Sequence, residues 1–278
     1  MTTPTSGATA RRMFGLVEPI GLIPYATDEP AEALMALGLR NYWDTYFAGR
    51  AAPLGRAPAE VVHAIFYNFA PGEVARHIPR VWDTITPDAA LVARQQGCVV
   101  ALRRILGDLA EAPGLARTAD LLTKAAISPP AIGRPLYAGL RALPLPDEPV
   151  ARLWHAANLL REHRGDGHTV ALVANSIGGT EAHVLFALSE GMPAEKFGRV
   201  SHLPQAQLAA VIDGMRARGL IGADGWLTAD GRATKQRIEA LTDDLAAPAY
   251  DGLELSELDQ LIAGLEPLAA ALASVGSS

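Results

Sequence analysis

The chain has 278 residues, of which 49% are hydrophobic and 19% charged, and its formal net charge is −6. This composition excludes intrinsic disorder as the main state. No run approaches 18 consecutive apolar residues, which excludes a membrane-spanning helix. The single cysteine, Cys98, excludes an internal disulfide and a zinc site built on several cysteines. We expect a soluble cytoplasmic protein with a disordered polar tail over residues 1–10 and no signal peptide.

Apolar residues recur at three- and four-residue spacing along most of the chain, which is the pattern of amphipathic helices. In Gly219–Thr228, by contrast, two short apolar pairs flank Asp224-Gly225, a sequence typical of a tight hairpin. Pro267 falls inside the last helix and is expected to kink or split it. The predicted fold is therefore all-α with one small β-hairpin. The predicted helices cover Glu60–Phe69, Ala89–Leu109, Leu115–Ala126, Val150–Glu162, Thr180–Glu190, Gln205–Arg218 and Leu255–Leu272.

The first 179 residues contain a weak internal similarity at an offset of 91 residues. Either a duplication or chance explains it in a chain so rich in alanine. A duplication would give each half a Tyr–Arg turn, a helix started by proline and a histidine after a loop, with a pocket between the halves. We therefore assign residues 11–179 to a helical pocket domain, with possible repeats 40–86 and 131–177. The matched pairs include Tyr46 with Tyr137, Arg50 with Arg141, Pro58 with Pro149 and His77 with His168.

Residues 180–248 show the element order of a winged helix-turn-helix. The helix Thr180–Glu190 is followed by a short helix from Pro193, the helix Gln205–Arg218, the hairpin and a long helix that opens at Thr228. The remaining residues, 249–278, are predicted to form a helix used for packing or for dimerisation.

The sequence of this module resembles the end of a MarR-type winged helix in Ile212–Ile221 and Trp226–Lys235. The whole chain also resembles a family of uncharacterised actinobacterial proteins that join a helical N-terminal region to such a module. The segments that carry this second resemblance are Arg11–Phe14, Leu37–Gly55, Tyr67–Phe69, Arg76–Asp83 and Leu160–His168. The resemblance implies a winged helix-turn-helix fold, and DNA as a possible partner.

The module departs from a DNA-reading pattern in two ways. Its predicted recognition helix offers Gln205 and Gln207 but then Ala209 and Ala210, and alanine gives only methyl contact with a base. The wing tip, Gly222–Gly225, is acidic where such regulators usually carry an arginine for the minor groove. Residues 194–237 have a net charge of +3, against −9 for the rest of the chain. The module therefore either contacts DNA or serves packing and dimerisation; its candidate phosphate ligands are Arg216, Arg218, Arg232 and Lys235.

The segment Trp154–His168 has the highest density of chemically active side chains. We expect its helix to end near Arg164-Gly165, so that Asp166 caps a new helix and His168 lies in the first turn of that helix. A helix N-terminus lowers the pKa of a histidine, which suits a general base. The alternative is a capped helix corner with solvated histidines. No metal is expected, because the spacing of these side chains matches no metal motif.

These residues lead to three hypotheses. In the first, a small-molecule pocket performs cofactor-free acid–base chemistry or sequesters a ligand, with His168 and His77 moving protons, Asp166 or Glu162 orienting them, and Arg50 and Arg141 binding an anion. In the second, the pocket is the sensor of a dimeric DNA-binding regulator. In the third, the chain is a purely structural partner-binding protein. The other side chains expected in the pocket are Tyr46, Tyr137, Tyr67, Asn68, Trp43, His155 and His163.

Overall fold

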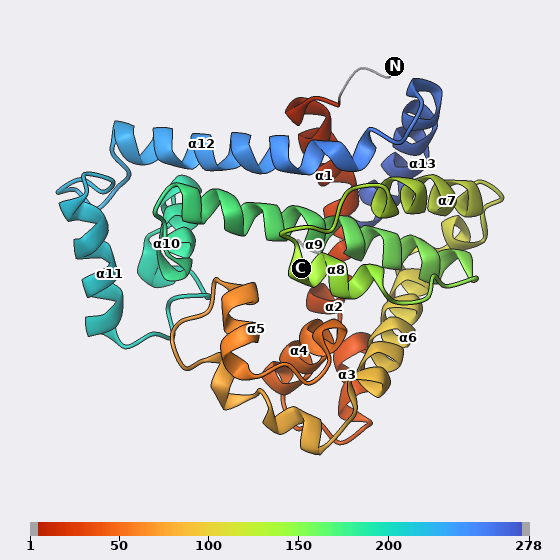
Figure 1. Cartoon of the computed structure of the whole chain (residues 1–278), viewed down its shortest axis with the longest axis horizontal. Helices are drawn as coiled ribbons and strands as arrows, with labels where there is room; N and C mark the ends of the chain where they lie inside the picture. Colours follow the sequence, from red (N-terminus) through yellow and green to blue (C-terminus); the bar gives the residue numbers. More distant parts are fainter. Residues whose placement is uncertain (1–4, 274–278) are drawn as a thin grey trace.

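The computed structural model describes residues 5–273. Over this range the chain forms α-helices joined by turns and short 3₁₀ segments, without a strand, so the all-α prediction is confirmed (Figure 1). The α-helices are α1 (Gly7–Gly21), α2 (Ile23–Ala26), α3 (Glu29–Met35), α4 (Tyr42–Ala51), α5 (Ala59–Phe66), α6 (Pro87–Leu106), α7 (Leu115–Ile127), α8 (Pro135–Arg141), α9 (Pro149–Ala174), α10 (Gly179–Ser189), α11 (Gln205–Ala217), α12 (Ala229–Ala246) and α13 (Leu255–Ala273). The 3₁₀ segments are Ala52–Leu54, Val74–Arg76, Arg80–Asp83, Gly107–Glu111, Ala194–Lys196 and Ala247–Tyr250.

The predicted tail is wrong from Gly7 onward, because α1 starts there. Ser6 caps this helix by accepting a hydrogen bond from the Thr9 amide at 3.3 Å. Three apolar residues of α1, Met13, Val17 and Ile20, are buried on one stripe. The polar start of the sequence hid this helix, which is part of the core; residues 1–4 of the predicted tail lie outside the described range.

The predicted helix end at Arg164-Gly165 is also wrong, because α9 runs unbroken for 26 residues. Two glycines inside a helix cost about 1 kcal/mol each relative to alanine, but α9 is buried on nearly every side and its packing outweighs that cost. Gly167 is needed for a close approach rather than for a turn. A Cβ at Gly167 would lie 2.7 Å from Nη1 of Arg134 and 3.3 Å from Cβ of Leu245.

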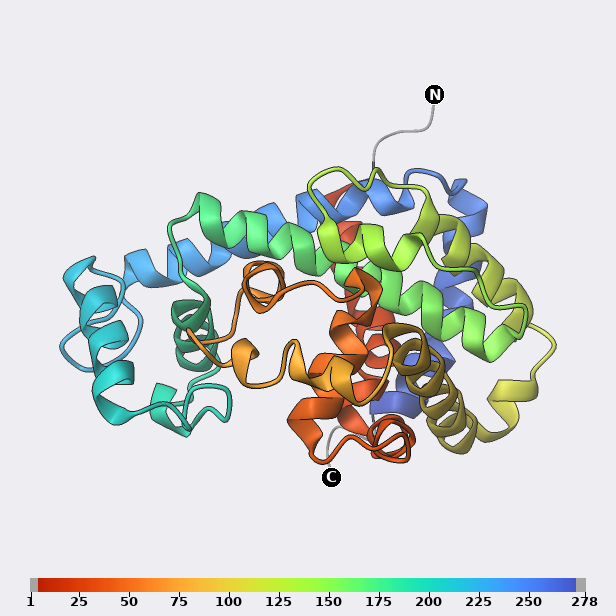
Figure 2. The same ribbon diagram turned by 60° about the horizontal axis from the view of Figure 1, so that its bottom comes forward.

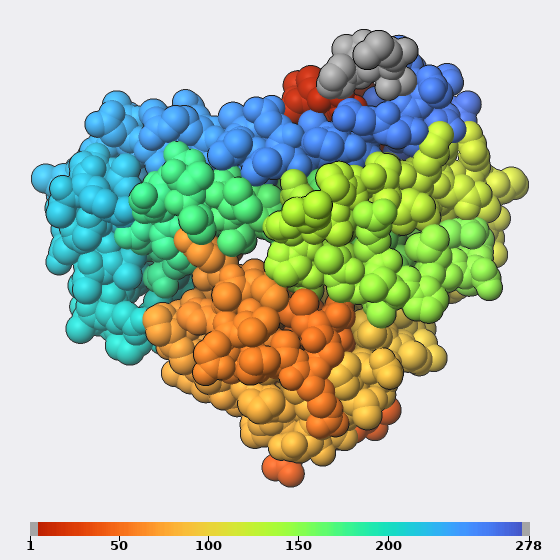
Figure 3. Space-filling model, in the orientation of Figure 1, coloured from red at the N-terminus to blue at the C-terminus, as the bar shows by residue number. Residues whose placement is uncertain are grey.

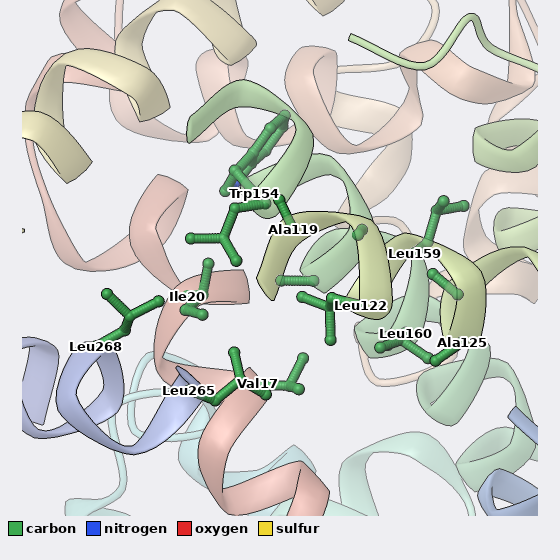
Figure 4. Close-up of a cluster of buried hydrophobic side chains, with 14 of the residues drawn as sticks. Val17, Ile20, Ala119, Leu122, Ala125, Trp154, Leu159, Leu160, Leu265 and Leu268 are labelled. Atoms are coloured by element: carbon green, nitrogen blue, oxygen red, sulfur yellow. The ribbon is translucent and has the colours of Figure 1, made fainter. Parts of the chain in front are cut away.

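The largest apolar cluster joins α1, α6, α7, the first half of α9, and α13. Figure 4 shows part of it, with Val17 of α1, Leu122 of α7, Trp154 of α9 and Leu265 of α13 converging. α13 therefore packs on the body of the protein, and it continues through Pro267 as one helix rather than splitting there. Residues 274–278 of the predicted C-terminal helix lie outside the described range.

A second apolar cluster lies around α3–α5 and the start of α6, and a third holds together α10, α11 and α12. The third cluster also takes in Ala171 and Leu172, at the end of α9. α9 and α12 lie side by side in both ribbon views, so that they connect the helix-turn-helix end of the molecule to its body (Figures 1 and 2).

The segment predicted as a hairpin contains one antiparallel bridge, between Ile221 and Leu227. The Gly222 amide donates to the Trp226 carbonyl at 2.8 Å, and Gly225 turns the chain with a φ of 84°. Within residues 5–273, no single helix is long and apolar enough to cross a membrane; α9 and α10 reach that composition only together, across a bend of 97°.

Candidate functional site

A cavity of about 310 Å³ lies between α9 and the α4–α5 segment. In Figure 3 the surface is open between the orange residues of that segment and the green residues of α9. α1, α10 and Arg199, in the segment between α10 and α11, complete the wall. A second cavity of about 150 Å³ shares Asn68, His168 and His183 with the first and adds Lys235 and Glu239 of α12.

Buried charges form the floor of the main cavity, which we call the central cavity. Arg50 of α4 donates from Nη2 to Oε2 of Glu162 at 3.0 Å. Arg161 donates from Nη1 to Oε1 of the same carboxylate at 2.9 Å, and its Nε lies 3.3 Å from Oε1 of Glu18. Glu162 is only 2% exposed, so this network ties α1, α4 and α9 together away from water.

The electrostatics of the network favour an ionised Glu162. Burial alone would raise the pKa of this carboxyl, but Arg50 and Arg161 outweigh burial and lower the pKa to about 2. Burial raises the pKa of Glu18, although Arg161 opposes it. The floor of the cavity thus carries two guanidinium groups around one firmly ionised carboxylate.

Asp166, one helical turn beyond Glu162, has the opposite electrostatic character. It is 7% exposed, and burial raises its pKa to about 6 despite the hydrogen bond of 3.0 Å that Oδ2 accepts from the Tyr137 amide. Two carboxyl groups on one face of α9 therefore titrate far apart, an arrangement that in enzymes separates an acid from a permanent charge.

Two histidines of the wall are neutral at physiological pH. Burial is the main cause of a lowered pKa in both residues: the pKa of His168 falls to about 4, and so does that of His183. His168 lies in the middle of α9, with Nδ1 2.9 Å from the Thr242 hydroxyl. The neutral form is thus what the sequence predicts, but burial rather than a helix N-terminus causes it.

Arg199 is the cation of this wall that forms no ion pair with any residue of 5–273. Its guanidinium lies over the rings of Phe69, at 4.3 Å, and Trp43, at 5.1 Å. Nη2 is buried without a hydrogen-bond partner in the described chain, and so is Nε2 of His183. The guanidinium of Arg199 can therefore donate to a ligand with oxygen acceptors, whereas Nε2 of the neutral His183, whose other ring nitrogen donates to the Asn68 backbone, is an acceptor.

Six residues predicted for the pocket line the central cavity: Tyr46, Arg50, Asn68, Glu162, Asp166 and His168. Tyr46 accepts a hydrogen bond of 3.0 Å from Nη1 of Arg50. The structure therefore brings these six predicted side chains together around one cavity.

The arrangement expected from the internal repeat is wrong. His168 follows no loop, since it is inside α9, whereas its match His77 lies between two 3₁₀ segments. Arg141 points elsewhere and donates to the Pro129 carbonyl at 2.8 Å. Arg50 and Arg141 consequently form no common anion clamp, because the helices that follow them differ in length, 8 residues in α5 and 26 in α9.

His77 belongs to a separate cluster beside α4. Its Nδ1 lies 2.7 Å from Oδ1 of the buried Asp44, to which Arg80 also donates at 2.8 Å, and its ring stacks on Phe47. Trp43 lines the adjoining cavity of about 330 Å³. Neither residue reaches the central cavity.

The other predicted residues have structural contacts. Tyr67 donates to the Ile177 carbonyl at 2.7 Å, and Tyr137 donates to the Ala126 carbonyl at 2.8 Å. His163 packs edge-on against Tyr137, and burial, followed by the nearby Arg134, lowers its pKa to about 3. His155 lines a different pocket, described below.

The basic residues predicted for DNA contact are engaged within the protein. Arg216 pairs with Asp213 and Lys235 pairs with Glu239. Arg218 pairs with Glu181 and donates to the Ser176 carbonyl.

Arg232 donates to the carbonyl of Leu227, next to the bridge, at 2.5 Å. Gln205 and Gln207 are exposed on α11, beside Ala209 and Ala210. The exposed face of the predicted recognition helix therefore offers few charged groups.

Sequence reasoning missed Glu18, Arg161, Arg199 and His183. They come from segments up to 181 residues apart, and no spacing rule connects them. One signal was available: Arg161-Glu162 follows the apolar pair Leu159-Leu160, and charges next to buried apolar residues of a helix need partners. Among residues 5–273, no three His, Cys, Asp or Glu side chains lie close enough to hold a metal ion.

The fold and these contacts define a helical protein in which α1, α4, α5, α9 and α10 surround a polar cavity. Residues 10–277 match a helix-turn-helix family, and the chain therefore belongs to that family. The chain matches no curated protein and no solved structure.

Proposed function

We propose that this protein binds a small organic anion in the central cavity and that the helix-turn-helix module serves there as part of the binding site. The observation that carries the proposal is Arg199, which lies in the wall, has a buried Nη2 without a hydrogen-bond partner and forms no ion pair within residues 5–273. Burying a guanidinium without a counter-charge is costly, and an anionic ligand removes that cost.

The charge balance of the lining supports an anion. Four arginines line the cavity, Arg50, Arg161, Arg164 and Arg199, against the three carboxyl groups Glu18, Glu162 and Asp166. Arg164 is held by Asp243 of α12 at 3.0 Å. Arg50 and Arg161 are held by Glu162, which leaves Arg199 to bind the carboxylate or phosphate of a ligand.

The aromatic lining specifies the rest of the ligand. Phe14, Tyr46, Phe66 and Phe69 all face the cavity, and such rings favour a flat apolar body. A volume of about 310 Å³ lies at the small end of the range for ligand pockets. The proposed ligand class is therefore a small aromatic carboxylate or phosphate monoester.

The cavity also supports proton transfer without a cofactor. Asp166, with a pKa of about 6, can donate a proton in weakly acidic solution, and the neutral His168, with a pKa of about 4, is a weak acceptor for one. Arg50 and Glu162 are ion-paired and hold the floor in place. We propose acid–base chemistry as the second step of the same site, after binding.

The test is a thermal-shift panel on the purified full chain with benzoate, 4-hydroxybenzoate and phenyl phosphate, and with benzyl alcohol as the uncharged control. We expect at least one anion to raise the melting temperature in a saturable way while benzyl alcohol does not. No saturable shift with any of the anions, or an equal shift with the alcohol, would contradict the proposal.

A second candidate function is that of a ligand-responsive, MarR-like dimeric regulator that binds DNA. Membership of a helix-turn-helix family favours it. The carboxylates beside Arg216, Arg218 and Lys235 weigh against it, because they cancel the net positive charge on which attraction to DNA phosphates depends. The test is a gel-shift titration on the DNA upstream of its own coding sequence at low and physiological salt; tight, salt-sensitive and sequence-selective binding would replace the first proposal with this one.

A further inference from the structure

A separate pocket of about 400 Å³ opens beside the first half of α9, between α6 and the proline-rich segment that follows α8. It shares no lining residue with the central cavity. Its walls are mainly apolar, formed by Leu91 and Val92 of α6, Leu140 of α8, and Leu143 and Leu145. Val92 and Leu145 stay largely exposed at its edge, so the apolar surface continues to the solvent.

Three buried polar side chains of α9 line this pocket without a hydrogen-bond partner at the atoms concerned. Asn158 is 1% exposed, and neither its Nδ2 nor its Oδ1 is bonded within residues 5–273. The same holds for Nε1 of Trp154 and Nε2 of His155, both on nine-tenths buried side chains. Each unsatisfied buried group destabilises the fold, and such a cluster therefore calls for a functional explanation.

The unpartnered groups belong to neutral side chains. A ligand bound here is therefore expected to carry an uncharged polar group at one end, which we call its head. Asn158 offers a donor and an acceptor on adjacent atoms of one planar group, while the Trp154 indole adds a donor. The nearby cation, Arg94, is already engaged: it donates to the Tyr25 hydroxyl at 2.9 Å and to the Gly49 carbonyl at 3.3 Å. A carboxamide or lactam presents the complementary pair of donor and acceptor, whereas a carboxylate presents acceptors only.

We propose that this pocket binds an apolar small molecule that carries a neutral carboxamide or lactam head, with the head bonded to Asn158 and Trp154 and the tail along Leu91, Leu143 and Leu145. The arrangement is the general one of ligand pockets, a mostly apolar lining with a few convergent polar groups. The site differs from the central cavity in both position and ligand charge, so the two proposals stand or fall separately.

The test is a calorimetric titration of the full-length wild type with octanamide and with octanoate, which have the same chain length. We expect saturable binding of octanamide, at least tenfold tighter than octanoate. Absence of saturable octanamide binding would overturn the proposal and indicate that solvent alone satisfies these groups, and tighter binding of octanoate would overturn the assignment of a neutral head.

Asn158→Leu is the decisive variant. It should weaken octanamide binding at least tenfold, because it removes the paired donor and acceptor, and should raise the melting temperature by roughly 2–4 °C, because it removes unsatisfied buried atoms. Wild-type affinity in this variant would overturn the proposal. Trp154→Phe keeps the ring without the indole N–H and serves if Asn158→Leu fails to fold; it too should weaken binding. Arg199→Gln, in the central cavity, is the matched control and should bind octanamide as the wild type does.

Discussion

The central cavity and the exposed face of α11 differ in what their cations do. In the cavity, Arg199 is partly buried and has no ion-pair partner among the described residues, while on the helix-turn-helix module Arg216 and Arg218 are exposed but paired with carboxylates. The carboxylate beside each surface cation reduces the net positive charge of that face, whereas a partly buried cation without a counter-charge gains more from binding an anion. In this member of a helix-turn-helix family, the cation without an ion-pair partner among the residues compared therefore lies in the cavity wall and not on the exposed face of α11.

The largest expected effect concerns the charge network that shapes the cavity floor. Glu162→Gln should lower the free energy of unfolding by about 3–5 kcal/mol, because it leaves two buried guanidinium groups without their carboxylate. Chemical denaturation at neutral pH measures it. Glu111→Gln, which alters an exposed pair with Arg103, should cost less than about 1 kcal/mol. Equal stability of Glu162→Gln and the wild type would show that the network does not hold the floor together.

Acid sensitivity provides the next test. His163 has a pKa of about 3 in the folded protein against 6.5 when exposed, so the unfolded chain binds more protons between these values. The stability that its neutral form contributes is full above pH 6.5 and falls as the pH drops toward 3. Between pH 6.5 and pH 3, the free energy of unfolding should therefore fall by roughly 1–3 kcal/mol less in His163→Leu than in the wild type. His202→Gln, at an exposed position, should leave the loss unchanged, and a wild-type pH profile in His163→Leu would contradict the assignment.

Proton uptake by Asp166 should tune anion binding to a smaller extent. Burial raises the pKa of Asp166 to about 6, so between pH 7 and 5.5 the cavity loses a negative charge while Glu162 stays ionised. The affinity for benzoate, which remains ionised over this range, should rise up to about tenfold. Asp166→Asn should show the higher affinity at both pH values. A wild-type affinity independent of pH would remove Asp166 from the site.

The smallest effect is expected on the exposed face of the module. Gln207→Ala and Arg216→Gln should change neither stability by more than about 0.5 kcal/mol nor anion affinity, because both side chains are exposed on α11 and away from the cavity. Loss of anion binding in either variant would mean that the two regions are coupled, as a sensor and its DNA-binding face must be.

The recurrence of apolar residues predicted α5, α6, α7, α10, α11 and α13, but none of the predicted ranges covers α2, α3, α4 or α8. The bounds of α7, α11 and α13 differ from those predicted by a residue or two. The prediction failed at Gly165-Asp166-Gly167, where a local rule predicts a turn but α9 continues, and where Gly167 packs closely against Arg134 and Leu245. α1 was likewise not predicted, because its first turn is polar and the apolar residues Met13 and Val17, which are buried on one face, come only later in the helix.

The site could be predicted only in part. Arg50, Glu162, Asp166 and His168 were recognised as chemically active, but the partner of Arg50 is 112 residues away and could not be inferred from spacing. Arg199 lies in an irregular segment between α10 and α11, where no periodicity indicates which way a side chain points. Such contacts depend on tertiary packing rather than on local pattern.

The measurement that tests the central claim most directly is a calorimetric titration of the best-binding anion of the thermal-shift panel into the wild type and Arg199→Gln. The account predicts saturable binding by the wild type and affinity at least tenfold weaker in the variant, because a charged hydrogen bond of this kind contributes roughly 1.5–3 kcal/mol. Arg216→Gln should titrate like the wild type. Equal affinity of the wild type and Arg199→Gln would contradict the claim that this arginine makes the cavity an anion site.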